Sequence, residues 1–298
     1  MLRDPIELYA YPREWCCDKG IVEKVKSGLY ILTKDGFLRR GITTATTACA
    51  AINAAIASTR GEVDSVEVLT PVGLRVRVEV DAEKGVARAR KFAGDHEFDV
   101  TDGIEVVAKL GGKGIVFGSG IGAIRGRKAV SRAAMRQIVD NFRKYAARYR
   151  YRGGVVVEVP DGERIAKRTK NEKLGILGGI SILGTTGFVE PWCRKLVETK
   201  IEIAKQYDKI VVATGRKAWQ YALKKYRGYQ PFVFGVHIDD VLEKHPGEKV
   251  VVGFPGLLSM WAGGRDKIEE KAARYGARIE VLEDAACSWS WNLQRAHN

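Results

Sequence analysis

Two glycine-rich segments of this chain have the residue types and spacing that hold anions or nucleotides. The first is GSGIG, in which Gly118, Gly120 and Gly122 stand between a predicted strand and a predicted basic helix. Glycines let a backbone turn tightly and approach a nucleotide, and the N-terminus of a helix attracts anions. The match to the dinucleotide-binding motif G-x-G-x-x-G is incomplete, because the last glycine falls one residue early. An ordinary structural turn is therefore an equal alternative.

The second segment is GGISILGTTGFVE, in which hydroxyl groups lie among glycines and a single acid follows. Its backbone N–H groups, with Thr185 and Thr186, could hold a carboxylate or phosphate. Glu190 could accept a ribose hydroxyl, a substrate amine or a proton. On residue types alone a packed turn with threonine caps is favoured, since Gly and Thr serve turns in all proteins. The candidate site residues of this segment are Gly178, Gly179, Ser181, Gly184, Thr185, Thr186, Gly187 and Glu190.

Two loops in the C-terminal half follow predicted strands. VVATGRK carries Gly215, and VVVGFPG carries Gly253 and Gly256. In an open parallel sheet, ligands bind beyond the carboxyl ends of the strands. These glycines are therefore candidate walls of a binding site, although each loop by itself is a weak signal.

Histidines and standard catalytic motifs give no competing site. His237 and His245 flank Asp239, Asp240 and Glu243, but the spacing matches no zinc signature and favours charges on a surface helix. H-E-x-x-H, G-x-x-x-x-G-K-[ST] and G-x-S-x-G are all absent. We therefore expect no metal held by the protein, and neither a P-loop ATPase nor a nucleophile-elbow hydrolase.

The composition is that of a globular protein that attracts polyanions. Of 298 residues 45% are hydrophobic, and the net charge is +14. The basic helix over 128–152 could bind nucleic acid, but no helix-turn-helix, zinc-finger or RNP-type signature accompanies it, so a solvated helix face is favoured.

Five cysteines without a C-x-x-C pair indicate a reduced, cytoplasmic protein. The longest uncharged stretches, 41–59 and 174–189, are too polar or too short to span a membrane, and the first residues lack the apolar core of a signal peptide.

The elements that must position these residues change character along the chain. Thr43 before an Ala-rich run predicts an N-cap and a helix. Residues 63–110 alternate apolar and polar side chains, which predicts antiparallel strands, and a helix follows over 129–149. From about residue 165 strands alternate with helices, one of which is expected to begin near Pro191. The predicted fold is therefore α+β and α/β in two domains: an α+β domain over 1–165 with a mainly antiparallel sheet, and a Rossmann-like α/β domain over 166–298 with a parallel sheet.

Three segments carry a family resemblance. GILGGISILGTTGFVEP resembles, nearly residue for residue, the signature of the cobalt-precorrin-5B C1-methyltransferases, the CbiD family of anaerobic cobalamin biosynthesis. LRRGITTATTACAAINAA is similar to the R-x-G-x-T-T-G-T-x-A-A-A helix start of that family, and VVVGFPGLLSMWAGG to its later strand–helix segment. The resemblance spans residues 38 to about 264. It departs at Ala45, where the family usually has glycine, and it lacks the Lys-Pro-Gly-Leu, Ile-Asn-Pro and Thr-His-Ser elements of the family.

The resemblance implies an enzyme that methylates C1 of cobalt-precorrin-5B to give cobalt-precorrin-6A. S-adenosyl-L-methionine would be the cosubstrate, and cobalt would arrive only inside the substrate. A sulfonium methyl group is already activated, so the protein mainly aligns carbon, methyl and sulfur. The carboxylates of the corrinoid would explain the positive charge. By matching position, the resemblance points to residues 178–190, with Glu190 as candidate base, and to Arg40, Gly41, Thr43 and Thr44.

Two other functions stay open on the residues alone. The glycine loops of an α/β half also suit a nicotinamide-dependent oxidoreductase, and the charge also suits a basic nucleic-acid-binding protein. The resemblance instead implies a small anionic corrinoid as partner, without membrane or nucleic acid. A homo-oligomer and hand-over to other enzymes of the pathway are compatible with it.

Overall fold

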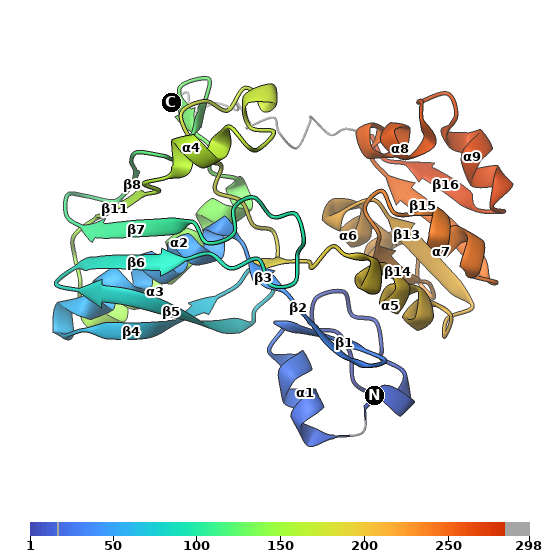
Figure 1. The fold of residues 1–298 in the computed structure, drawn as a ribbon, viewed down its shortest axis with the longest axis horizontal. Coiled ribbons are helices and arrows are strands. Elements are labelled where there is room, and N and C mark those ends of the chain that lie inside the picture. The colour runs from blue at the N-terminus through green and yellow to red at the C-terminus, as the bar shows by residue number, and fades with distance from the viewer. Residues whose placement is uncertain (17, 284–298) are drawn as a thin grey trace. The chain divides into compact units, whose positions relative to one another are not determined.

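The structure is a computed structural model that describes residues 1–16 and 18–283. These residues divide into two compact units, each built from segments far apart in the sequence (Figure 1). The antiparallel unit comprises residues 23–31 and 37–192. The parallel unit comprises residues 1–22, 32–36 and the described chain from residue 193 onward. Each unit is named for the sheet that it contains.

Short elements carry the chain from one unit to the other. The crossings fall within α1 (Lys19–Lys26), β1 (Tyr30–Thr33) and β2 (Gly36–Arg39), and after Trp192. A short 3-10 helix, Arg13–Trp15, precedes α1, and β1 and β2 form a two-stranded sheet.

A six-stranded sheet in the order β4-β5-β6-β7-β11-β8 forms the frame of the antiparallel unit. Its neighbouring strands are antiparallel except for β11 and β8. The alternation in the sequence explains this arrangement, because Val76 and Val78 of β5 are buried while Arg77 between them is exposed. The strands are β4 (Val63–Leu69), β5 (Arg75–Glu83), β6 (Val86–Arg90), β7 (Glu105–Leu110), β8 (Ile115–Phe117) and β11 (Val155–Glu158).

Two helices lie on one face of this sheet (Figure 1). α2 (Thr44–Ala57) has Thr43 as its N-cap, which confirms the predicted start, and all 14 of its residues are buried. Its alanines let α2 pack closely against both the sheet and α3 (Arg132–Tyr149), whose N-cap is Ser131. The shorter elements of this unit are β3 (Gly41–Ile42), β9 (Ala123–Ile124), β10 (Arg127–Lys128), α4 (Gly162–Ala166), β12 (Phe188–Val189) and the 3-10 helices Ser58–Arg60 and Glu172–Leu174.

The parallel unit contains a four-stranded sheet in the order β14-β13-β15-β16, parallel throughout. This confirms parallel strands in the C-terminal half, and the continuous buried runs of β13 and β15 are typical of a sheet covered on both faces. Its elements are α5 (Arg194–Ala204), β13 (Lys209–Ala213), α6 (Arg216–Lys225), β14 (Gln230–Val233), α7 (Asp239–Lys244), β15 (Glu248–Gly253), α8 (Pro255–Ala262), α9 (Ile268–Arg274) and β16 (Arg278–Val281).

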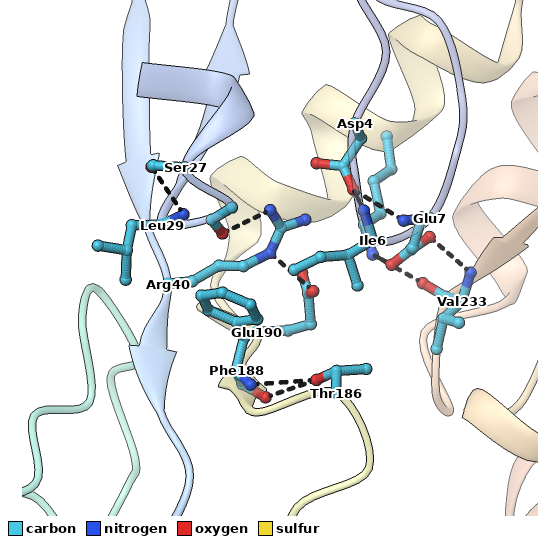
Figure 2. Close-up of polar contacts among 12 residues, drawn as sticks. Asp4, Ile6, Glu7, Ser27, Leu29, Arg40, Thr186, Phe188, Glu190 and Val233 are labelled. Atoms are coloured by element: carbon cyan, nitrogen blue, oxygen red, sulfur yellow. Dashed lines mark hydrogen bonds and ion pairs between the residues drawn. The ribbon is translucent and has the colours of Figure 1, made fainter. Parts of the chain in front are cut away.

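The first residues of the chain join the parallel unit through a buried carboxylate. Oε2 of Glu7 accepts a hydrogen bond from the backbone N–H of Val233 at the end of β14, at 3.0 Å (Figure 2). Oε1 of Glu7 accepts one from Lys200 of α5, and Asp4 caps the turn by accepting from the backbone of Ile6 and Glu7. These contacts attach the N-terminal segment to the edge strand.

The structure differs from the sequence predictions at several points. Residues 166–192 stay with the antiparallel unit through the pairing of β12 with β3, so the predicted boundary at 165/166 falls inside that unit. α5 begins at Arg194 rather than Pro191, because Cys193 is extended and forms the N-cap. His245 is buried, not on a surface, and its ring nitrogens contact Tyr207 O and Gly247 N.

Taken together, the described residues form a mixed α/β fold with both antiparallel and parallel sheets. Within that part of the chain no helix combines the length and the apolar character needed to cross a membrane. The Rossmann-like classification of the parallel unit stays a prediction.

Candidate functional site

An antiparallel strand pair brings Arg40 and Glu190 together. β3 and β12 pair with Ile42 opposite Phe188 and Gly41 opposite Val189, and the next step of this register places Arg40 opposite Glu190. Nε of Arg40 donates to Oε1 of Glu190 at 2.8 Å, and Nη1 donates to the carbonyl of Gly28 at 3.1 Å (Figure 2). The Arg40 side chain is fully buried, whereas that of Glu190 is 18% exposed. A buried guanidinium thus fixes the orientation of the Glu190 carboxylate, whose Oε2 is itself buried.

The loop at residues 92–95 braces the backbone around Arg40. A Cβ on Gly41 would lie 2.4 Å from the backbone of Ala93, and one on Gly94 would lie 2.2 Å from Arg39 O. The carboxylate of Asp95 accepts a hydrogen bond from the backbone N–H of Arg39 at 2.7 Å. Sequence analysis identified Gly41 but missed Gly94 and Asp95, because nothing in the local sequence of 92–95 indicates a partner more than fifty residues away.

The threonines at the start of α2 bind the segment 178–190, which we call the signature loop. The hydroxyl of Thr44 accepts from Leu183 N at 2.8 Å, and Thr43 N donates to Gly187 O at 3.1 Å. The hydroxyl of Thr46 donates to the same Gly187 carbonyl at 2.8 Å and accepts from Gln137 of α3. Gly184 lies so close to Thr43 that a Cβ would come within 2.5 Å of its hydroxyl oxygen. The predicted residues Thr43 and Thr44 therefore hold the signature loop in place.

The signature loop itself presents its hydroxyl groups unequally. Ser181 is buried and lies 3.5 Å from Asn171, and Thr186 closes a turn by accepting from Phe188 N at 3.2 Å. Thr185 is exposed. Gly178, Gly179 and Gly187 all have a positive φ, which explains glycine at these positions. Thr185 is thus the hydroxyl of this loop that is most accessible to a ligand.

The glycine loop, residues 118–122, packs against the signature loop. Ile180 N donates to Gly120 O at 3.0 Å, and Gly122 N donates to Ile180 O at 2.8 Å. Gly120 also approaches the backbone of Val159 so closely that a Cβ would lie 1.7 Å from its carbonyl oxygen. The structure therefore brings the predicted segments 40–44, 118–122 and 178–190 together within the antiparallel unit.

Two charged side chains that sequence analysis missed surround the glycine loop. Nζ of Lys128 donates to the carbonyls of Gly118 and Ile121, the latter at 2.8 Å. Glu158 accepts hydrogen bonds from Lys109 and from Ser119 of the loop, and these bonds lower the pKa of the Glu158 carboxyl. Lys128 lies in the basic run RGRK, whose position beside the loop depends on the β9–β10 turn rather than on any motif.

Gly215, Gly253 and Gly256 lie in the parallel unit, at the carboxyl ends of its central strands. Gly215 is the N-cap of α6 after β13, Gly253 ends β15, and Gly256 lies in the first turn of α8. Thr214, which sequence analysis did not select, directly precedes Gly215, packs over Gly253 and is 3% exposed. The predicted site residues thus form two groups, one in each unit.

Known proteins resemble this chain over nearly its whole length. A family model described as CbiD matches residues 32–191. A protein of Archaeoglobus fulgidus named cobalt-precorrin-5B C(1)-methyltransferase is 62% identical over 295 residues, covering 99% of each chain. A protein of Methanosarcina acetivorans with the same name is 38% identical, covering 95% of this chain and 88% of its own.

A solved structure agrees with these relatives. The 1.9 Å crystal structure of a cobalamin biosynthesis protein (cbiD) from Archaeoglobus fulgidus matches with a TM-score of 0.93 and 63% sequence identity. The match covers 95% of this chain and all of the other.

Proposed function

This chain belongs to the CbiD family, and we propose that it transfers a methyl group from S-adenosyl-L-methionine to C1 of cobalt-precorrin-5B. It is an enzyme, a C-methyltransferase whose substrate is that corrinoid. The observation that carries this conclusion is the 62% identity over nearly the full length to a relative of that name. The oxidoreductase and nucleic-acid-binding alternatives lose their support, because they rested on glycine loops and charge that a methyltransferase explains equally well.

The bonds and charges of the reaction balance simply. A bond forms between C1 and the methyl carbon, the bond from that carbon to sulfur breaks, and its electron pair stays on sulfur. The sulfonium charge is thereby lost, and one proton leaves the corrinoid. Protein groups must therefore align the donor with C1 and accept that proton.

We assign Glu190 as the base that accepts the proton from the corrinoid. Its side chain is 18% exposed, and the buried guanidinium of Arg40 fixes the orientation of its carboxylate at 2.8 Å. A base held in one orientation needs no reorganisation during the reaction. Arg40 holds this carboxylate directly, and Gly41, Thr43 and Thr44 hold the backbone and the signature loop around it.

Charge favours the corrinoid as the ligand of this protein. The substrate carries acetate and propionate groups, and the chain has a net charge of +14. Exposed arginines such as Arg132, Arg136 and Arg143 on α3 add to a field that attracts such an anion. Cobalt enters as part of the substrate, so the reaction asks for no metal ligands from the protein.

The test is an anaerobic conversion assay. The protein is incubated with cobalt-precorrin-5B and the donor, and S-adenosylhomocysteine and corrinoid masses are followed. We expect one hydrogen of the substrate to be replaced by one methyl group, with one S-adenosylhomocysteine formed per product. An unchanged corrinoid mass, with no donor consumed, would overturn the proposed function.

The role of Glu190 is tested by Glu190→Gln, which retains an oxygen to accept from Arg40. We expect kcat to fall by about 10²-fold or more, as for loss of a general base. The matched control is Glu198→Gln, which alters an exposed carboxylate paired with Arg194 and leaves kcat unchanged. An unchanged kcat in Glu190→Gln would remove Glu190 from the proton transfer.

A further inference from the structure

Most glycines of this chain are required by the fold, and two at the carboxyl ends of β13 and β15 are not. The fold requires glycine where φ is positive or where a Cβ would collide with other atoms. Gly118, Gly120 and Gly122 meet the second condition, since a Cβ would lie within 2.8, 1.7 and 2.6 Å of the nearest atom. Those glycines serve contacts within the protein.

Gly215 and Gly256 meet neither condition. Gly215 is extended, and the nearest atom to a Cβ there is in Leu257 at 4.0 Å. A Cβ on Gly256 would meet nothing within 4 Å. Among the glycines that the structure describes, only Gly20 in α1 shares this freedom. The space that a side chain would fill at 215 and 256 fits the close approach of a ligand.

A buried hydroxyl directly precedes Gly215 in the chain. Thr214 is 3% exposed, and its hydroxyl has no hydrogen-bond partner among the described residues. It fills the space over Gly253, where a Cβ would lie 2.5 Å from Oγ1 of Thr214. Because a buried hydroxyl without a partner is unfavourable, this group points to a ligand atom that hydrogen-bonds with it.

The first turns of α8 add an apolar surface beside Gly215. Leu257 and Met260 are 38% and 64% exposed and lie three residues apart, hence on the same face of the helix. Flexible apolar side chains of this kind pack against flat rings. The N-terminus of the ten-residue helix α6, which Gly215 caps, faces the same edge and favours a carboxylate.

We propose that the methyl donor binds to the parallel unit at this edge. Its adenosyl group approaches the backbone at Gly215 and Gly256, the adenine lies against Leu257 and Met260, and a ribose hydroxyl bonds with Thr214. The inference rests on the proposed function and adds to it the place of the donor.

The test is calorimetric titration of the intact protein with S-adenosylhomocysteine. The variants are Gly215→Ala, Gly256→Ala and Thr214→Val, with Gly20→Ala as the matched control because it adds the same methyl group at an equally open glycine. We expect affinity to fall about tenfold or more in the first two variants, to fall in the third, and to be unchanged in the control. The Tm of Gly256→Ala should equal or exceed that of the wild type, because alanine favours a helix. Gly215→Ala should lower the Tm slightly, because alanine is a poorer N-cap than glycine, so Gly256→Ala is the variant that separates lost affinity from lost folding.

The outcomes separate this inference from the proposed function. Wild-type affinity in the Gly215→Ala/Gly256→Ala double variant would overturn the donor site while the function stands. So would a raised KM for the corrinoid with an unchanged Kd for S-adenosylhomocysteine, or a wild type that methylates but binds no S-adenosylhomocysteine alone. A wild type that neither binds S-adenosylhomocysteine nor methylates the corrinoid would overturn the function itself.

Discussion

Nε of Arg40 and Oε1 of Glu190 lie 2.8 Å apart although the two residues are 150 positions apart in the sequence. The contact follows from the register of β3 and β12, and the loop at Ala93–Asp95 holds the arginine backbone from the other side. The Arg40 side chain is fully buried, and that of Glu190 is 18% exposed. The pair therefore holds the carboxylate of Glu190 in one orientation.

Removing the buried cation should be costly. We expect Arg40→Ala to lower the free energy of unfolding by about 3 kcal/mol, because it breaks an ion pair whose guanidinium is shielded from water. The matched control is Arg194→Ala, in which the same atoms also pair at 2.8 Å but the arginine is 92% exposed. There the change should stay within about 0.5 kcal/mol. Denaturant titration measures the free energy of unfolding of both variants. Equal losses in Arg40→Ala and Arg194→Ala would show that the burial of Arg40 does not determine the strength of its ion pair.

Gly120 should be irreplaceable for packing reasons. Gly120→Ala adds a Cβ that would lie 1.7 Å from Val159 O at a φ of +68°, so we expect a loss of about 3 kcal/mol or more. Gly126→Ala is the control, because it has a φ of +75° but no atom within 4 Å, and it should cost about 1 kcal/mol. Thermal unfolding measures both. Similar losses in the two variants would show that the close approach at Gly120 is not what matters.

The hydroxyl of Thr46 should stabilise the signature loop. In Thr46→Val, the carbonyl of Gly187 and the amide of Gln137 each lose one hydrogen bond but keep another, from Thr43 N and to Leu69 O, so the change should cost about 1 kcal/mol. Thr185→Val removes an exposed hydroxyl from the same loop and should change stability by less than about 0.5 kcal/mol. If Thr185 contacts substrate, its variant instead raises KM. If the free energy of unfolding of Thr46→Val equals that of the wild type, the hydroxyl of Thr46 does not stabilise the signature loop.

Asp99 should make stability depend on pH in the acid range. Burial acts to raise the pKa of Asp99, but hydrogen bonds from Lys91 and Thr101 outweigh it and hold the pKa below its usual value. The stabilisation is therefore present above the unfolded pKa, about 3.9, and is lost as pH falls through the folded pKa. We expect the gap in unfolding free energy between wild type and Asp99→Asn to shrink below about pH 4. A gap that stays constant from about pH 6 to pH 3 would contradict this.

The helix start at Thr43 and the antiparallel strands could be predicted from the sequence because their signals lie in neighbouring residues. Thr43 before an alanine run marks an N-cap whatever surrounds it, and the alternation over residues 63–110 defines strands that bury one face. The signature loop was selected on its glycines and hydroxyls and Arg40 through a family resemblance, and the structure places Arg40 beside the end of that loop.

The rest depends on partners distant in the sequence. No local signal near Glu7 indicates that its carboxylate accepts a hydrogen bond from the backbone N–H of Val233. The packing of residues 1–22 in the parallel unit was therefore not predictable from the sequence. Lys128 and Thr214 carry no motif, and their roles appear only once the glycine loop and the strand ends are in place. The predicted cytoplasmic location and homo-oligomer stay predictions.

The central claim is the position of methylation, and one measurement tests it most directly. The protein is incubated anaerobically with cobalt-precorrin-5B and a donor carrying a ¹³C-labelled methyl group, and the product is examined by NMR. The account predicts a single labelled methyl carbon bonded to C1 of the corrinoid. A label at any other position, or no label in the product while the donor and substrate remain intact, would contradict it.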